Sequence, residues 1–326
     1  MTAISLPPGG AVWHVDWSIR PAKRWMTAIT MATDGRLIAS GPQPFQPQLD
    51  KLLSIDGVLP APLVIGLDMP IGLPEPYARR VGITDFCRFL KGEEGPDWSD
   101  FSTVSERLAT VTPNRPFFPK GNIADTDKQG GKPQQNWLKQ LGMEKAETYR
   151  RCDLGTDDRA SAASLFWTKG ANQVGKAALS GWSELIAPLL RHQADQVGLW
   201  PFDGDLAALV QDRRVTVVEA YPGEIYGWFG CKPRSKTKRD SRLEQVVALE
   251  AAIDQLELQL SSDAKQQLAD GFGDDDKGED RFDCFVGALG LVAVLADHQP
   301  APTPEDPIFR SIEGWILGQS LDCLER

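Results

Sequence analysis

LVIGLDMPIGLP, residues 63–74, contains an apolar segment that ends abruptly at an acid. Its first five residues are apolar or glycine, which is typical of a strand covered on both faces of a sheet. Pro70, Gly72 and Pro74 prevent the strand from continuing, so Asp68 lies at its carboxyl end. In open α/β sheets, ligands bind at the carboxyl ends of strands. The stretch therefore predicts an α/β fold with Asp68 at a binding edge.

A second junction of a strand and an acid lies at residues 215–219, where VTVV is followed by Glu219. A carboxylate beside a dry core is costly unless it is paired, hydrogen-bonded or bound to a metal. Taken singly, Asp68 could be a turn residue and Glu219 one half of a salt bridge. Together with Asp16 on the first predicted strand, they favour a shared site.

The start of the chain predicts three antiparallel strands. The turn Asp34-Gly35 is a strong two-residue hairpin signal, and a basic turn at residues 20–24 joins the first two strands. The segments rich in Val, Trp, Ile and Thr are residues 11–18, 25–33 and 36–40. A short helix is expected at residues 48–55.

The middle of the chain, approximately residues 75–214, has mostly helical signals and no repeat of fixed length. Helical spacing is found at residues 77–90 and 176–190, and the polar residues 121–135 are expected to form an exposed loop. A further helical region is predicted at residues 243–268. We therefore predict one α/β domain, residues 1–326, whose mixed sheet is flanked by helices and interrupted by this long helical insertion.

Residues 282–296 predict a helix in the protein interior, because apolar side chains cover most of its circumference. Asp283 lies near its start, and Asp280 lies three residues earlier. Residues three apart share a face of a helix, so both carboxylates could face one centre. They could equally cap free N–H groups and favour the helix dipole. The sequence leaves both alternatives open.

The net charge of −10 and the pI of about 4.9 argue against tight nonspecific binding of nucleic acid, which usually requires a basic protein. Residues 232–242 are the exception, with six cations and one acid. This basic segment is either a phosphate-binding surface or an ordinary solvated face. The candidate substrate contacts in it are Lys236, Lys238 and Arg239.

Five scattered cysteines without a C-x-x-C pair argue against a disulfide framework or a zinc knuckle and favour a reducing cytoplasm. The first ten residues have no apolar stretch typical of a signal peptide, and the apolar run 285–296 is too short to span a bilayer. We therefore expect a cytoplasmic protein with no membrane partner. No oligomeric state is predicted.

Carboxylates without clustered His or Cys suit Mg²⁺ or Mn²⁺ rather than zinc. Two such ions, roughly 3.5–4 Å apart, can activate a water and stabilise the leaving oxygen in phosphodiester hydrolysis. Their charge would also let an acidic protein approach a polyanion. The predicted catalytic acids and metal ligands are Asp16, Asp68, Glu219 and Asp283, with Asp280 as a further metal ligand.

Five phrases of the sequence resemble a family of uncharacterised proteins described as predicted RNase H-like nucleases. They are VDWS (15–18), VIGLDMPIGLPE (64–75), VVEAYPGE (217–224), SKTKR (235–239) and EDRFDCFVGAL (279–289). The second is the most specific, and the resemblance covers the outer parts of the chain, with the middle only loosely matched. It implies an RNase H-like fold and a metal site. The family's acids correspond to Asp16, Asp68, Glu219, Asp280 and Asp283.

One position departs from the family pattern, which has a second Glu directly after the proline. Here Gly223 follows Pro222 and Glu224 comes next, so the departure affects a role for Glu224 and leaves Glu219 unchanged.

Three functions are compatible with the sequence. The first is a Mg²⁺- or Mn²⁺-dependent nuclease acting on a nucleic-acid substrate. The second is a non-catalytic binding or scaffold protein of the same fold, which the acidic pI favours. The third is a phosphotransferase of the actin and sugar-kinase type, but the glycine-rich phosphate hairpin expected after Asp16 is replaced by Trp-Ser-Ile-Arg. The phosphate loop G-x-x-x-x-G-K-[ST], the zinc motif H-E-x-x-H and the nucleophile elbow G-x-S-x-G are absent from the sequence.

Overall fold

The computed structural model describes residues 4, 6–47, 49, 52, 60–118, 133–155, 159–168, 173–192, 194–321 and 324. The chain divides into two compact units. The first contains Met1–Met69, His192–Thr303 and Trp315–Leu321, and the second contains Pro70–Arg191, Pro304–Gly314 and Asp322–Arg326.

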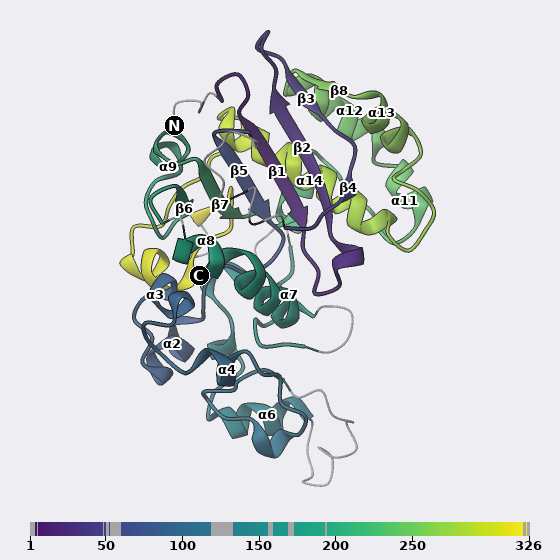
Figure 1. Ribbon diagram of the computed structural model, residues 1–326. Helices are drawn as coiled ribbons and strands as arrows, with labels where there is room; N and C mark the ends of the chain where they lie inside the picture. Colours follow the sequence, from purple (N-terminus) through teal and green to yellow (C-terminus); the bar gives the residue numbers. More distant parts are fainter. Residues whose placement is uncertain are drawn as a thin grey trace. The chain divides into compact units, whose positions relative to one another are not determined.

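The sheet lies in the first unit, and within the described residues it has eight strands (Figure 1). They are β1 (Ala11–Asp16), β2 (Trp25–Met31), β3 (Leu37–Ala39), β4 (Gln43–Pro44), β5 (Leu63–Leu67), β6 (Val197–Leu199), β7 (Val215–Glu219) and β8 (Leu258–Leu260). The order is β6-β7-β5-β1-β2-β3-β8, and β4 pairs with β2. Strand β2 is antiparallel to both β1 and β3. Strands β6, β7, β5 and β1 run parallel to one another. The predicted α/β class with a mixed sheet is confirmed.

The helices of the first unit are α9 (Leu206–Asp212), α10 (Pro222–Trp228), α11 (Arg239–Leu243), α12 (Val246–Gln255), α13 (Ser262–Ala269) and α14 (Gly278–Leu295), with a short turn η1 (Pro21–Lys23) between β1 and β2. Helix α14 confirms the interior helix predicted at residues 282–296.

Two predicted boundaries are wrong. The helical region 243–268 is interrupted by β8, because Glu257 takes a positive φ of 54° that ends α12 and turns the chain into a strand beside β3. The predicted insertion, residues 75–214, runs past the second unit, because β6 and α9 belong to the first. The helix expected at residues 48–55 falls mostly outside the described residues, as does the loop at 121–135.

Helix α14 packs against β1, β2 and α10 (Figure 1). A Cβ on Gly287 would lie 2.2 Å from Nε2 of His14, a buried residue of β1. A Cβ on Gly290 would lie 2.6 Å from Cδ1 of Ile225 in α10. The missing side chains therefore let α14 approach β1 at Gly287 and α10 at Gly290 more closely than alanines would permit. The His14 ring, not a ligand, fills the space above Gly287.

The second unit contains α2 (Glu75–Val81), α3 (Phe86–Lys91), α4 (Trp98–Phe101), α6 (Pro133–Leu141), α7 (Val174–Gly181) and α8 (Ala187–His192), with short turns η2 (Leu108–Thr110), η3 (Ala146–Thr148) and η4 (Arg151–Asp153) and π-helical turns η5 (Trp182–Ile186) and η6 (Phe309–Glu313). Its core is aromatic: the ring of Phe101 lies 4.9 Å from that of Phe89 and 5.3 Å from that of Phe117. The predicted helix at residues 77–90 is two helices, because Gly82 takes a left-handed φ of 74° and ends the first.

The Pro-Ile-Gly-Leu-Pro part of the specific sequence phrase serves the packing of the second unit. The Trp182 indole donates to the Pro70 carbonyl at 2.8 Å, and the Glu75 amide donates to the Glu313 carboxylate at 3.1 Å. Gly72 has a φ of 135°, and a Cβ there would lie 2.1 Å from the Glu313 carbonyl oxygen. Only glycine fits both the backbone angle and the space. Residues 70–74 of this phrase therefore have a structural role in the second unit, whereas Asp68 lies before them at the end of β5.

A search of the described residues for an apolar helix long enough to cross a bilayer finds none.

We predict that Gly287→Ala lowers the free energy of unfolding by about 1–3 kcal/mol, because the added methyl overlaps the His14 ring. Gly227→Ala is the matched control. Gly227 lies exposed in α10 with nothing within 4 Å of an added Cβ, so this change should stabilise by about 0.4–1 kcal/mol. Denaturant unfolding of both variants measures the difference, and equal effects would contradict close packing of α14.

Candidate metal centre

Asp16 and Asp68 lie next to each other at one edge of the sheet. Asp16 is the last residue of β1, and Asp68 follows the last residue of β5, its parallel neighbour. The Asp68 amide donates to the Val15 carbonyl at 3.0 Å, which extends the pairing to these residues. Since side chains alternate along a strand, Asp16 projects from the same face as His14, which is the face that α14 covers.

Asp283 reaches this face from α14. Its side chain is 6% exposed, and both of its oxygens have partners from other elements. The Tyr226 hydroxyl of α10 donates to Oδ1, and the Lys236 ammonium donates to Oδ2. The N-terminal cap of α14 is Lys277. These contacts therefore argue against helix capping as the role of Asp283 and favour a carboxylate that faces a shared centre.

The carboxylates interact through their charges. The pKa of Asp16 is raised well above its ordinary value, first by burial and then by the charges of Asp68, Asp283 and Asp280. The pKa of Asp68 is raised to about 7, first by burial and then by Asp283, with Lys236 opposing the shift and Glu219 adding to it. These acids from β1, β5 and α14 therefore lie close enough to resist ionising together.

Asp280 and Asp283 show the same conflict on α14. The pKa of Asp280 is raised to about 6, chiefly by burial, with Lys23 opposing the shift. Its Oδ2 atom is buried and has no hydrogen-bond partner. The pKa of Asp283 is also raised, because burial outweighs the stabilising contacts of Lys236 and Tyr226. A buried carboxylate oxygen without a donor is a position where a cation would be favourable.

Lys236 lies among these acids, although the sequence predicts it to contact phosphate. Its ammonium contacts Asp283 Oδ2 and lies 3.3 Å from Glu279 Oε1. Burial disfavours the charged form of Lys236, yet its pKa is raised because Asp283, Asp68 and Glu279 outweigh burial. The side chain is 39% exposed, so it is only partly buried among the acids.

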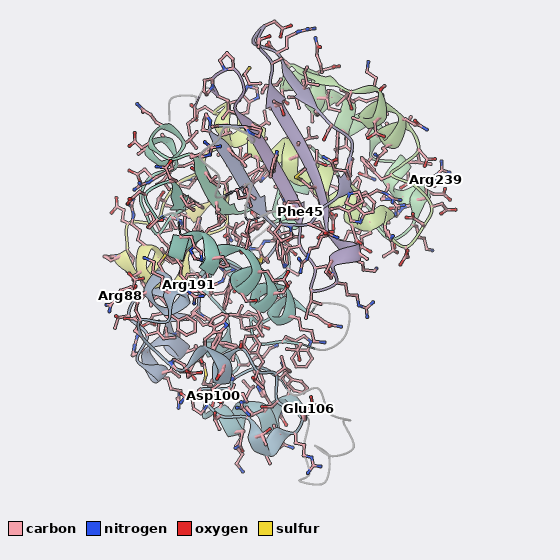
Figure 2. The ribbon with its side chains drawn as sticks, in the orientation of Figure 1. Phe45, Arg88, Asp100, Glu106, Arg191 and Arg239 are labelled. Atoms are coloured by element: carbon pink, nitrogen blue, oxygen red, sulfur yellow. The ribbon has the colours of Figure 1, made fainter. Side chains whose placement is uncertain are left out.

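The other two predicted substrate contacts do not join the acids. Arg239, which Figure 2 labels, is the first residue of α11. It donates to the Asp270 carbonyl at 2.7 Å and pairs with the Asp270 carboxylate. Lys238 is exposed, and its amide donates to Ser235 at 2.9 Å. The basic segment 232–242 therefore turns Lys236 and Arg242 inward, whereas Lys232, Arg234 and Lys238 are exposed.

Glu219 has a different position from the four aspartates. It is buried at the end of β7 and pairs with Leu67, the residue before Asp68. Alternation of side chains places Glu219 with Leu67 and Val15, on the face opposite to α14. Its charge still raises the pKa of Asp68, so it lies near the cluster without sharing its face.

Two site residues were missed from the sequence, Tyr226 and Glu279. Glu279 lies four residues before Asp283, a spacing that places both on one helix face, so this signal was available. Nothing local distinguishes Tyr226, because its partner Asp283 is 57 residues away.

The donor chemistry of the cluster fits a hard divalent ion, since carboxylate oxygens are the ligands that Mg²⁺ and Mn²⁺ prefer. The buried, unpartnered Oδ2 of Asp280 is consistent with this. Across the described part of the chain, however, no three His, Cys, Asp or Glu side chains are already arranged to hold an ion. Comparisons with protein-family models, curated proteins and solved structures gave no match.

We predict that Asp68→Asn stabilises the metal-free protein at high pH. The folded pKa of about 7 exceeds the ordinary 3.8, so the native state holds this proton more tightly than the unfolded chain. The resulting stability is complete below about pH 4 and is lost as the pH rises through about 7. In EDTA, the Tm of Asp68→Asn should exceed that of the unaltered protein at about pH 8 and converge with it toward about pH 4.

The matched control is Asp254→Asn, on the exposed face of α12. The Tm of Asp254→Asn, relative to the unaltered protein, should not increase with pH. Equal Tm differences for Asp68→Asn at both ends of the pH range would contradict the burial of charge at this position.

Proposed function

We propose that the chain is a divalent-metal-dependent phosphodiesterase with an RNase H-like fold, acting on a nucleic acid. The observation that carries the proposal is the convergence of Asp16, Asp68 and Asp283: the charges of Asp68 and Asp283 raise the pKa of Asp16, and the charge of Asp283 raises the pKa of Asp68. They come from β1, β5 and α14, three elements distant in sequence. Such a cluster is costly in a protein that does not neutralise it.

The sheet supports the RNase H-like part of the proposal. Strands β1, β2 and β3 are consecutive and antiparallel, and β5 and β7 add in parallel on the other side of β1. This is the mixed sheet that the family resemblance implies. The candidate acids lie at the carboxyl ends of β1 and β5, where open α/β sheets bind their ligands.

The four aspartates Asp16, Asp68, Asp280 and Asp283 would hold Mg²⁺ or Mn²⁺. When bound, such an ion activates a water and stabilises the charge that develops on a phosphate oxygen. The chain's own contribution is orientation. Tyr226 fixes one oxygen of Asp283 and Lys236 fixes the other, so this carboxylate cannot rotate freely.

A nucleic-acid substrate is supported by the distribution of charge. The chain carries a net charge of −10, so a polyanion would be repelled except where cations are exposed. Lys238 is exposed in the same segment that delivers Lys236 to the acids. Lys238 is two residues from Lys236 in the sequence, so a phosphate bound by Lys238 would lie near the candidate centre.

A non-catalytic binding protein is the second candidate. It is favoured by the observation that no three acids in the described residues are arranged to hold an ion. In that case the aspartates would be neutralised by Lys236 and by protons, and the protein would bind nucleic acid without cleaving it.

We predict cleavage of labelled single- or double-stranded DNA or RNA in Mg²⁺ or Mn²⁺ and no cleavage in EDTA. Asp68→Asn and Asp16→Asn should each lower the rate by at least about 100-fold, since even groups that only support metal ligands contribute 10–100-fold. Asp254→Asn is the matched control and should retain the rate. Binding of these oligonucleotides without metal-dependent cleavage would support the second candidate instead.

A further inference from the structure

The ammonium of Lys236 is held in the acidic cluster by contacts on two sides. It donates to Asp283 Oδ2, and Glu279 Oε1 lies 3.3 Å away. Both acids are on α14, one turn apart. An ammonium between two carboxylates of one helix face supplies positive charge there, as a bound metal ion would.

The backbone of Lys236 is fixed by a fully buried arginine. Arg242 donates through Nη1 to the Lys236 carbonyl at 2.5 Å and through Nε to the Gly271 carbonyl at 2.9 Å. A third bond goes from its Nη2 to the Gly273 carbonyl. A Cβ on Gly278, the first residue of α14, would lie 2.2 Å from the same Nη2. Arg242 therefore connects the basic segment to the start of the helix that carries Asp283.

Further hydrogen bonds close the basic segment on itself. The Ser235 amide donates to the Ser241 hydroxyl at 3.1 Å, and the Lys238 amide donates to the Ser235 carbonyl at 2.9 Å. These contacts bracket Lys236 on both sides in the chain. These hydrogen bonds therefore fix the backbone position from which the Lys236 side chain reaches the acids.

The charge of the cluster explains what this cation does. Two divalent ions would bring four positive charges to the aspartates, but one position beside Asp283 already has an ammonium. A divalent ion placed against the same Asp283 oxygen would be repelled by the Lys236 ammonium, which disfavours a second ion at this position.

We propose that the Lys236 ammonium is a permanent counter-ion of the acidic cluster and replaces one of two divalent ions, so that the centre takes a single metal ion. The inference rests on the proposed function for the remaining ion. Lys236 is thus a positioning residue, which orients Asp283 and limits how many metal ions the cluster accepts.

The test compares Lys236→Met, which keeps the length of the side chain without its charge, with Lys232→Met as the matched control. Lys232 is an exposed lysine of the same segment, outside the acidic cluster. Isothermal titration of the full chain with Mn²⁺ should give one ion per unaltered chain and two per Lys236→Met chain. Lys232→Met should again give one ion.

Thermal unfolding in EDTA provides the second measurement. Without metal, Lys236→Met leaves a buried carboxylate oxygen without its partner, and its Tm should fall by about 5 °C or more. Lys236→Arg should recover part of the loss, and Lys232→Met should remain within about 1 °C. A Tm of Lys236→Met equal to that of the unaltered protein would overturn the role of Lys236 as counter-ion.

The two proposals fail in different ways. Two Mn²⁺ ions bound to the unaltered chain would overturn the inference while leaving the proposed metal-dependent function standing. No Mn²⁺ bound to the unaltered chain or to Lys236→Met would overturn both the metal centre and the single-ion inference. If neither chain binds Mn²⁺ but the Tm of Lys236→Met is lowered, Lys236 has the simpler role of neutralising the acids.

Discussion

The constraint on which the first unit depends is the burial of like charges between helix α14 and the sheet. Asp16 and Asp68 end neighbouring strands, and α14 brings Asp283 onto the same face. The approach is close because Gly287 has no side chain above His14. Packing that favours the helix thus creates the electrostatic conflict, and a buried carboxylate requires either a proton or a cation. The raised pKa values of these acids are the direct consequence.

Lys236 resolves part of the conflict, and the way it is held links electrostatics to backbone structure. A lysine side chain is flexible, and ordering it has an entropic cost. Here Arg242 fixes the Lys236 carbonyl through a guanidinium that is itself fully buried. Arginine suits this task because its planar group donates in several fixed directions at once. The buried Arg242 therefore fixes the backbone position from which the flexible Lys236 side chain reaches the acids.

Much of the sheet could be predicted because its strands have local signals. The apolar run before Asp68 and the run before Glu219 each end at an acid, and both strands are where the pattern places them. Strand β8 was missed because it has only three residues between two helices and is defined by its partner β3. The face on which Glu219 projects was missed for a related reason: it depends on register with Leu67, and a shift of one residue reverses it.

The candidate site was predictable in its acids and not in their partners. Asp16 and Asp68 have distinctive positions at strand ends, and Asp283 lies in the first turns of a long apolar helix. Tyr226 and Lys236 instead acquire their roles from α10 and the basic segment folding against α14. Composition alone assigns the same meaning to every cation in residues 232–242. The structure separates them by direction, since Arg239 pairs with Asp270 while Lys236 turns inward. A basic run in an acidic protein can therefore neutralise the protein's own carboxylates, and only the cations left at the surface are available to a polyanion.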